Sequence, residues 1–321
     1  PSTQNIQLTI DTTPYPIPIF VSPLGLTITS NPQHILSLKT HQNALTRIFS
    51  DIQGEIASIP AISSPGSITT FNRQPQILND GLHTITAISI DEVGNISGTS
   101  TQDVRLNIDT TPPLIPIIVF PSSSIITNNP NPVILANNGE PLTTYLLYNN
   151  STQIGQGTVN VTNSFPSTPS SPLADGVYTI RLKARDAAFN ESGFSTQNIT
   201  ITVDTNTITP TITSPNIIIH TSANSIIIEG TAEPNSIVSL WDFPTPTTTV
   251  PTFIASGNAS STGNWSINTG SIAEKMYYIR ANYLDLANNT SLYSNTATVN
   301  IDATPPNVPI LTYPQNQSTT L

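Results

Sequence analysis

A short stretch recurs four times along this chain, and the interval between its copies sets the size of the folding unit. It reads LTIDTTPYPIP at residues 8–18, LNIDTTPPLIP at 106–116, ITVDTNTITP at 201–210 and VNIDATPPNVP at 299–309. Its aspartates are Asp11, Asp109, Asp204 and Asp302, so the intervals are 98, 95 and 98 residues. A unit of this length can bury a core of its own, unlike the short repeats of solenoids.

Each unit ends in a pattern that predicts a β-hairpin. Apolar residues alternate with polar ones before every aspartate, as in Val104, Leu106 and Ile108, which is typical of a half-buried strand. A second segment aligns without gaps: DGLHTITAISIDEVGN at 80–95, DGVYTIRLKARDAAFN at 175–190 and EKMYYIRANYLDLANN at 274–289. It predicts the penultimate strand and a turn. Residues 45–51 show helical spacing, but their alignment with 142–149 predicts a strand there as well.

Strands throughout, with turn signals every 8–12 residues, predict an all-β fold of tandem immunoglobulin-like β-sandwich domains in a linear rod. The repeat places the boundaries. Residues 1–11 are the last strand of a preceding domain, and residues 303–321 begin a following one. Three domains lie between them, at 12–109, 110–204 and 205–302.

The composition argues against several functions. Only 9% of the residues are charged, the net charge is −10, and nine lysines and arginines are spread over 321 residues. We therefore expect no nucleic-acid partner. No apolar stretch approaches the length of a membrane span, so we expect no membrane insertion in this segment. There is no cysteine, the four histidines are dispersed, and no nucleotide-binding or nucleophile motif occurs, which predicts that the chain is not an enzyme.

The series DGxYTI…A…DxxxN followed by IDTTPPxxP resembles the bacterial Ig-like domains that repeat in tandem in large surface adhesins and biofilm-associated proteins. The third unit adds GTAEPNSIVSLWD at 230–242 and STGNWSIN at 261–268. The resemblance implies an extracellular, cell-surface location and a structural or adhesive role. The chain departs from the pattern at His83, where the other units have Tyr178 and Tyr277, and at Glu274-Lys275, which replaces Asp-Gly.

Aromatic residues have mainly structural interpretations. Tyr178 and Tyr277 begin the penultimate strand, where a hydroxyl can pin the preceding corner, as in the tyrosine corner of immunoglobulin-like sandwiches. Trp241 and Trp265 are expected in core and edge packing of the third unit. A sugar-binding platform is the alternative for the two tryptophans.

The recurring acidic residues predict one candidate site. In a seven-stranded antiparallel sandwich, the turn between the last two strands returns to the pole where the domain begins. The turn residues should therefore approach the aspartate at the domain entry: Asp91 and Asn95 approach Asp11; Asp186 and Asn190 approach Asp109; Asp285, Asn288 and Asn289 approach Asp204. Carboxylate, amide and carbonyl oxygens suit calcium, and the resemblance implies calcium at domain junctions. The same residues are good turn formers without metal, so interdomain calcium and turn capping both stay open.

We expect a non-catalytic extracellular segment that serves as a semi-rigid stalk of Ig-like repeats in a large cell-surface adhesin or matrix protein. One alternative is a subunit of a surface filament or sheath assembled by strand complementation. Another is an accessory Ig-like array of a secreted glycan-active enzyme. Expected partners are neighbouring Ig-like repeats of the same chain or of adjacent subunits, and cell-surface glycans or proteins.

Overall fold

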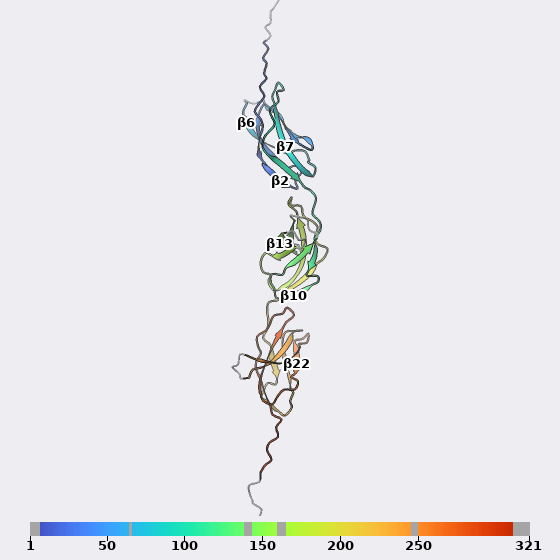
Figure 1. The fold of residues 1–321 in the computed structure, drawn as a ribbon, viewed down its shortest axis with the longest axis vertical. Coiled ribbons are helices and arrows are strands. Elements are labelled where there is room, and N and C mark those ends of the chain that lie inside the picture. Colours follow the sequence, from blue (N-terminus) through green and yellow to red (C-terminus); the bar gives the residue numbers. More distant parts are fainter. Residues whose placement is uncertain (1–6, 64–65, 138–142, 159–164, 245–249, 311–321) are drawn as a thin grey trace, which may run out of the picture. The chain divides into compact units, whose positions relative to one another are not determined.

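The computed structural model describes residues 7–63, 66–137, 143–158, 165–244 and 250–310. In these ranges the chain forms strands and no helix, which confirms the predicted all-β class. The strands fall into three groups by hydrogen bonding, called here the first repeat (β1–β8), the second repeat (β9–β16) and the third repeat (β17–β24) (Figure 1).

The strands of the first repeat are β1 (Ile19–Ser22), β2 (Gly25–Thr29), β3 (Leu36–His41), β4 (Leu45–Ser50), β5 (Gly54–Ile59), β6 (Ile68–Arg73), β7 (Gly81–Ile90) and β8 (Val104–Ile108). Those of the second are β9 (Ile117–Phe120), β10 (Ile125–Thr127), β11 (Ile134–Asn137), β12 (Thr144–Asn149), β13 (Thr152–Thr158), β14 (Phe165–Pro169), β15 (Gly176–Arg185) and β16 (Ile199–Val203). Those of the third are β17 (Thr211–Ser214), β18 (Ile219–Thr221), β19 (Ile227–Thr231), β20 (Ile237–Asp242), β21 (Thr252–Asn258), β22 (Asn264–Asn268), β23 (Met276–Leu284) and β24 (Ala297–Ile301).

The first repeat is a sandwich of a three-stranded sheet, β1-β3-β6, and a five-stranded sheet, β2-β8-β7-β4-β5. The predicted alternation is what builds its core, because every second side chain of a strand faces the opposite sheet. Leu38, Ile48, Ile85 and Leu106 come from four different strands and are all fully buried. The segment with helical spacing is β4, as its alignment with the second repeat predicted.

The opening strand of each repeat is split into two short strands that pair with different partners. In the first repeat β1 pairs with β3, the chain passes Pro23, and β2 then pairs in parallel with the last strand, β8. Pro23 cannot donate a ladder hydrogen bond, which favours ending the first pairing there. The pairs β10·β16 and β18·β24 are parallel in the same way. The prediction of seven antiparallel strands was therefore wrong: each repeat shows eight described strands and one parallel pair.

The second repeat differs because its strands form one continuous sheet, in the order β10-β16-β15-β12-β13-β14-β11-β9. The join is the pairing of β13 with β14, which brings Gly155 opposite Pro169. A Cβ on Gly155 would lie 2.1 Å from the carbonyl oxygen of Thr168, so only glycine permits this approach. Among the described strands of the other repeats, β5 and β6, and likewise β21 and β22, are not hydrogen-bonded to each other.

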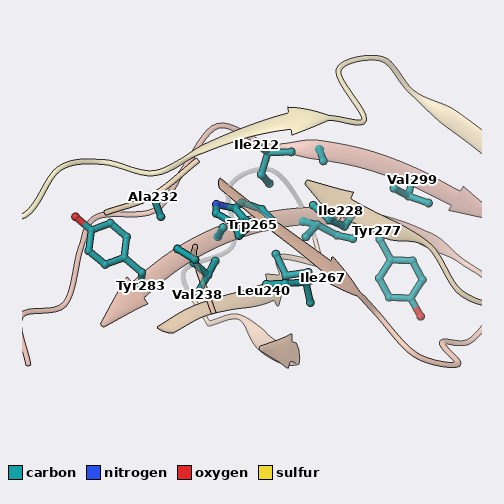
Figure 2. Close-up of a cluster of buried hydrophobic side chains, with 14 of the residues drawn as sticks. Ile212, Ile228, Ala232, Val238, Leu240, Trp265, Ile267, Tyr277, Tyr283 and Val299 are labelled. Carbon is teal, nitrogen blue, oxygen red and sulfur yellow. The ribbon is translucent and has the colours of Figure 1, made fainter. Parts of the chain in front are cut away.

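The core of the third repeat is built around Trp265, which lies among Ile212, Ile228 and Leu240 (Figure 2). The indole is 4% exposed, and its strand neighbour is Gly230. A Cβ on Gly230 would come within 2.4 Å of the indole ring, so the glycine makes the room that the tryptophan fills. This confirms the core packing predicted for Trp265. Trp241 instead lies on the opposite face of β20 from the buried Leu240, packs edge-on against Phe253, and donates its indole N–H to Asn282.

Contacts between Cα atoms divide the chain into two compact units. One contains Pro1–Ser123, Val133–Ser171 and Thr179–Ile199, and the other contains Ser124–Pro132, Pro172–Tyr178 and Thr200–Leu321. This division passes through the second repeat. The domain boundaries predicted from the sequence, at 12–109, 110–204 and 205–302, therefore stay predictions.

Candidate functional site

The turn that follows the penultimate strand is the same structure in all three repeats. In the first repeat the carboxylate Oδ1 of Asp91 accepts the backbone N–H of Val93 at 3.0 Å and that of Asn95 at 2.7 Å. The Oδ1 atoms of Asp186 and Asp285 accept the N–H groups of Asn190 and Asn289 at 2.9 and 2.8 Å. Burial raises the pKa of Asp91, but the hydrogen bonds from Asn95 and the turn amides outweigh it and hold that pKa below its usual value.

The asparagine that closes each turn joins it to the chain entering the repeat. Its side-chain Nδ2 donates both to the turn carboxylate and to a backbone carbonyl of the entry aspartate. In the first repeat Asn95 donates to Asp91 Oδ2 at 2.7 Å and to the Asp11 carbonyl at 3.1 Å. The corresponding distances are 2.9 and 2.7 Å for Asn190, and 2.8 and 2.8 Å for Asn289. The predicted approach of turn and entry segment is therefore present.

In the third repeat the bridging residue is Asn289, and Asn288 occupies another position. Asn288 has a φ of 70°, in the left-handed region, and its side chain is exposed. The residues at the same place in the other turns are Gly94, with a φ of 92°, and Phe189, with a φ of 69°. Asparagine and glycine suit this conformation, whereas a phenylalanine there is unusual.

The entry aspartates use their side chains to cap their own turns. The Oδ1 atoms of Asp11 and Asp109 accept the N–H groups of Thr13 and Thr111, at 2.9 and 3.1 Å. Asp204 and Asp302 accept N–H groups two residues on, at 3.2 and 3.1 Å. This is the Asx-turn geometry of the turn-capping alternative.

A second acidic residue holds each linker from the other side, and the sequence reasoning missed it. Asp80, at the start of the penultimate strand, accepts the hydroxyl of Thr110 at 2.9 Å, the Thr110 N–H at 3.2 Å and the Thr111 hydroxyl at 3.2 Å. The hydrogen bond from the Thr110 hydroxyl, followed by that from its amide, holds the pKa of Asp80 below its usual value. The signal that could have found this contact was the recurrence of an acidic residue at 80, 175 and 274.

The later linkers repeat this contact. Asp175 accepts the Thr205 hydroxyl at 2.8 Å and also the side-chain amide of Asn206. Glu274 accepts the Thr304 hydroxyl at 2.8 Å. We call the whole arrangement the linker clamp: the turn asparagine on the entry carbonyl, together with the acidic residue on the linker hydroxyls. The linker at 109–111 and that at 204–206 each carry both halves of the clamp.

The first two turns do not fit a calcium ion well. Asp91 and Asp186 have their oxygens occupied by N–H donors, and the turn asparagine presents its N–H group, rather than its oxygen, to the entry carbonyl. A cation needs free oxygen ligands, about six to eight of them for calcium. These two turns therefore fit the capping alternative in the geometry present.

The third turn has an additional carboxylate. Ligand oxygens of Asp204, Glu233 and Asp285 all lie within 4.8 Å of one another. Glu233 comes from the loop between β19 and β20 and accepts the Tyr283 hydroxyl at 3.1 Å. Burial raises the pKa of Glu233, and the charges of Asp204 and Asp285 raise it further. Asp285 accepts the same N–H donors as the other two turn aspartates, so the difference of this turn is the added carboxylate of Glu233, which supplies further oxygen ligands for a hard divalent cation.

The predicted tyrosine corners are present. Tyr178 donates its hydroxyl to the carbonyl of Ala174 at 2.8 Å, and Tyr277 donates to Ala273 at 3.0 Å. In Figure 2, Tyr277 and Tyr283 lie at opposite ends of the core cluster with their hydroxyls directed outward. His83, the departure noted in the first repeat, keeps the same contact, because its Nε2 lies 2.8 Å from the carbonyl oxygen of Asn79.

The fold and these corners define a chain of immunoglobulin-like β-sandwiches. Residues 121–205 match the family model of the bacterial Ig-like domain, which confirms the predicted resemblance over the second repeat. A comparison with curated protein sequences gives no match. In the described residues we find no helix that is long and apolar enough to span a membrane.

Several solved structures are similar to the chain. The fibronectin(III)-like modules of Clostridium thermocellum CbhA are 16% identical, with a TM-score of 0.35 over 58% of this chain and 94% of that one. A tetra-tandem repeat in the extending region of a large adhesion protein is 17% identical, with a TM-score of 0.28 over 89% and 74%. The BSP domain of a biofilm associated protein is 11% identical, with a TM-score of 0.23 over 93% and 68%. At these values we take the likenesses as similarity only.

Proposed function

We propose that the chain is a non-catalytic, structural and adhesive segment of an extracellular surface protein, in which the repeats form a semi-rigid stalk. The bacterial Ig-like match at 121–205 supports a surface protein of this kind. The observation that carries the proposal is the linker clamp. Its residues recur at intervals of 95 and 99 positions, and their hydrogen bonds hold the linkers that follow or precede each sandwich.

The clamp explains why a short polar linker should resist bending. At the linker 109–111, Asn190 holds the carbonyl of Asp109 from one side, and Asp80 holds Thr110 and Thr111 from the other. Prolines follow directly at 112 and 113, which fixes the backbone φ of the next residues. A linker with several of its donors and acceptors engaged has fewer conformations than a free polar linker of the same length.

The proposal is tested by loosening both linkers and measuring their motion in the whole chain. We expect Asp80→Ala together with Asp175→Ala to lower the amide order parameters of 109–111 and 204–206 from about 0.85 toward about 0.6. Asp103→Ala is the control, because the Asp103 carboxylate is exposed and pairs with the nearby Arg105 rather than with a linker. Equal order parameters for the linkers in the unmodified chain, the double variant and the control would refute a stalk stiffened by clamps.

For the third turn we propose a calcium ion held by Asp204, Glu233 and Asp285. The mutual proximity of the three carboxylates supports this, since a divalent cation would offset their repulsion. We expect calcium to raise the melting temperature of the third repeat and Glu233→Gln to abolish the effect. Asn190→Asp, which adds a carboxylate to the second turn, provides a comparison for the effect of calcium there. A melting curve that is the same with calcium and with chelator would contradict the proposal and leave the stalk proposal untouched.

A further inference from the structure

One strand of the second repeat carries an unusual share of the positive charge of this acidic chain. Arg181, Lys183 and Arg185 alternate along β15, and all three face away from the core, because the intervening Leu182 and Ala184 are fully buried. They are three of the nine lysines and arginines in a chain of net charge −10. We call them the basic row. The equivalent residues of β7, read from the aligned segments, are Thr86, Ile88 and Ile90.

Aromatic rings accompany the basic row. The guanidinium carbon of Arg181 lies 4.1 Å from the ring centre of Phe194, and that of Arg185 lies 5.5 Å from Phe189. Lys183 lies 4.9 Å from the Phe194 ring. A guanidinium group this close to an aromatic ring is stabilised by the cation–π interaction and can still donate N–H groups to a planar acceptor.

The two arginines have no acidic partner within the described residues. In the part of the chain that the structure describes, the one ion pair of the row joins Lys183 to Glu191, at 3.0 Å. The Nε of Arg181 is buried, and no acceptor among the described residues lies within hydrogen-bonding distance of it. Arg181 and Arg185 are four residues apart on a strand, or about 13 Å. The row therefore presents two uncompensated guanidinium groups, each beside a phenyl ring, at a fixed spacing.

Phe189 gives an independent indication that this surface binds something. Its φ of 69° is in the left-handed region, which is costly for a bulky residue, and its side chain is 71% exposed. Because the phenyl ring is exposed, its burial does not offset the cost of this backbone conformation. The other two repeats place Gly94 and Asn288 at this position, which suit the conformation. A strained backbone that displays an apolar ring beside a free arginine is typical of a ligand contact.

We propose that the basic row, with Phe189 and Phe194, binds a linear polysaccharide that carries carboxylate groups. Each arginine would pair with a sugar carboxylate through two parallel N–H···O bonds, and the rings would contact the C–H faces of the sugars. This goes beyond the stalk role and rests on the second repeat alone. A second copy of the chain fits less well, because no described strand carries more than one acidic residue to match the row. Nucleic acid is disfavoured by the net charge of −10.

The test measures binding of the whole chain to polygalacturonate, with dextran, double-stranded DNA and the protein alone as comparisons. We expect binding to polygalacturonate only, and its loss in about 0.5 M NaCl, where charge interactions are screened within a few ångströms. Arg181→Gln with Arg185→Gln should weaken it about tenfold, since each charged contact contributes roughly threefold. The control is Arg73→Gln with Arg105→Gln in the first repeat, which should bind normally.

Phe189→Asn separates binding from folding. It installs the residue that the third repeat uses at this position, so the melting temperature should not fall, while binding should weaken severalfold. Equal binding of dextran or of DNA, self-association of the protein without polymer, or unchanged binding in the double arginine variant would each overturn the proposal. So would the absence of binding to polygalacturonate. None of these results bears on the stiffness of the linkers, which is measured separately.

Discussion

Replacing Asn190 by alanine is the most direct test of the linker clamp. The change removes the Nδ2 donor to the Asp109 carbonyl and to the Asp186 carboxylate, at 2.7 and 2.9 Å. A neutral hydrogen bond contributes about 1 kcal/mol and one to a charged group about 2 kcal/mol. Both partners are half-buried rather than fully buried, so water recovers part of this, and we expect a local loss of about 2 kcal/mol.

The loss should be local, because the backbone N–H of Asn190 still donates to Asp186 and the core is untouched. Hydrogen exchange followed by mass spectrometry measures it on peptides that cover the turn 186–190 and the linker 109–111. A change of about 2 kcal/mol corresponds to exchange roughly 30-fold faster where opening is local. Peptides of the third repeat in the same sample provide the unchanged reference.

Asn198→Ala is the matched control, since Asn198 is an exposed asparagine of the same repeat whose side chain takes no part in the clamp. It should leave exchange in the turn and linker unchanged. If Asn190→Ala altered exchange by less than about threefold, the bridging hydrogen bonds would contribute little. The physical reasoning behind the clamp would then be wrong, whatever the geometry suggests.

Other predictions address the core, the corner and the pH response. Gly230→Ala should destabilise the third repeat by about 2–3 kcal/mol in denaturant unfolding, because the new Cβ would meet the Thr211 carbonyl oxygen at 2.1 Å; an unchanged midpoint would contradict the packing described. Tyr277→Phe should cost about 1 kcal/mol through the lost bond to Ala273, and the exposed Tyr293→Phe almost nothing. The lowered pKa of Asp80 means that its contact is complete above about pH 4 and lost as the pH falls through its folded value. Exchange of the Thr110 amide, corrected for its intrinsic rate, should therefore rise on acidification, and Asp80→Asn should remove that response.

The strands and the closing turn could be predicted because each has a local signal. Alternation before Asp109 is enough to place β8, and the four-residue spacing from Asp186 to Asn190 is enough to predict a turn. The same spacing, applied strictly, identifies Asn289 as the bridging residue in the third repeat, where two adjacent asparagines made the choice ambiguous. The local sequence pattern therefore contained enough information to choose Asn289 over Asn288 as the bridging residue.

The split opening strand and the continuous sheet of the second repeat depend on contacts between distant residues. The sequence around Gly25 does not predict that β2 runs parallel to β8, because the partner strand is about eighty positions away. The approach of β13 to β14 rests on Gly155 facing Pro169, and an isolated glycine is compatible with many structures. The basic row corresponds to the segment RLKAR at 181–185. A count of nine cations over the whole chain does not show that three of them lie on one face of β15.

The continuous sheet of the second repeat bears on how this chain folds during synthesis. Adjacent repeats of similar sequence can exchange strands while they fold, and the unpaired edges of a half-formed sandwich are where a foreign strand enters. In the second repeat β13 and β14 pair with each other, and Gly155 permits the close approach of the two backbones. We therefore expect the second repeat, in which β13 and β14 are paired with each other, to prevent exchange of strands between the first and third repeats.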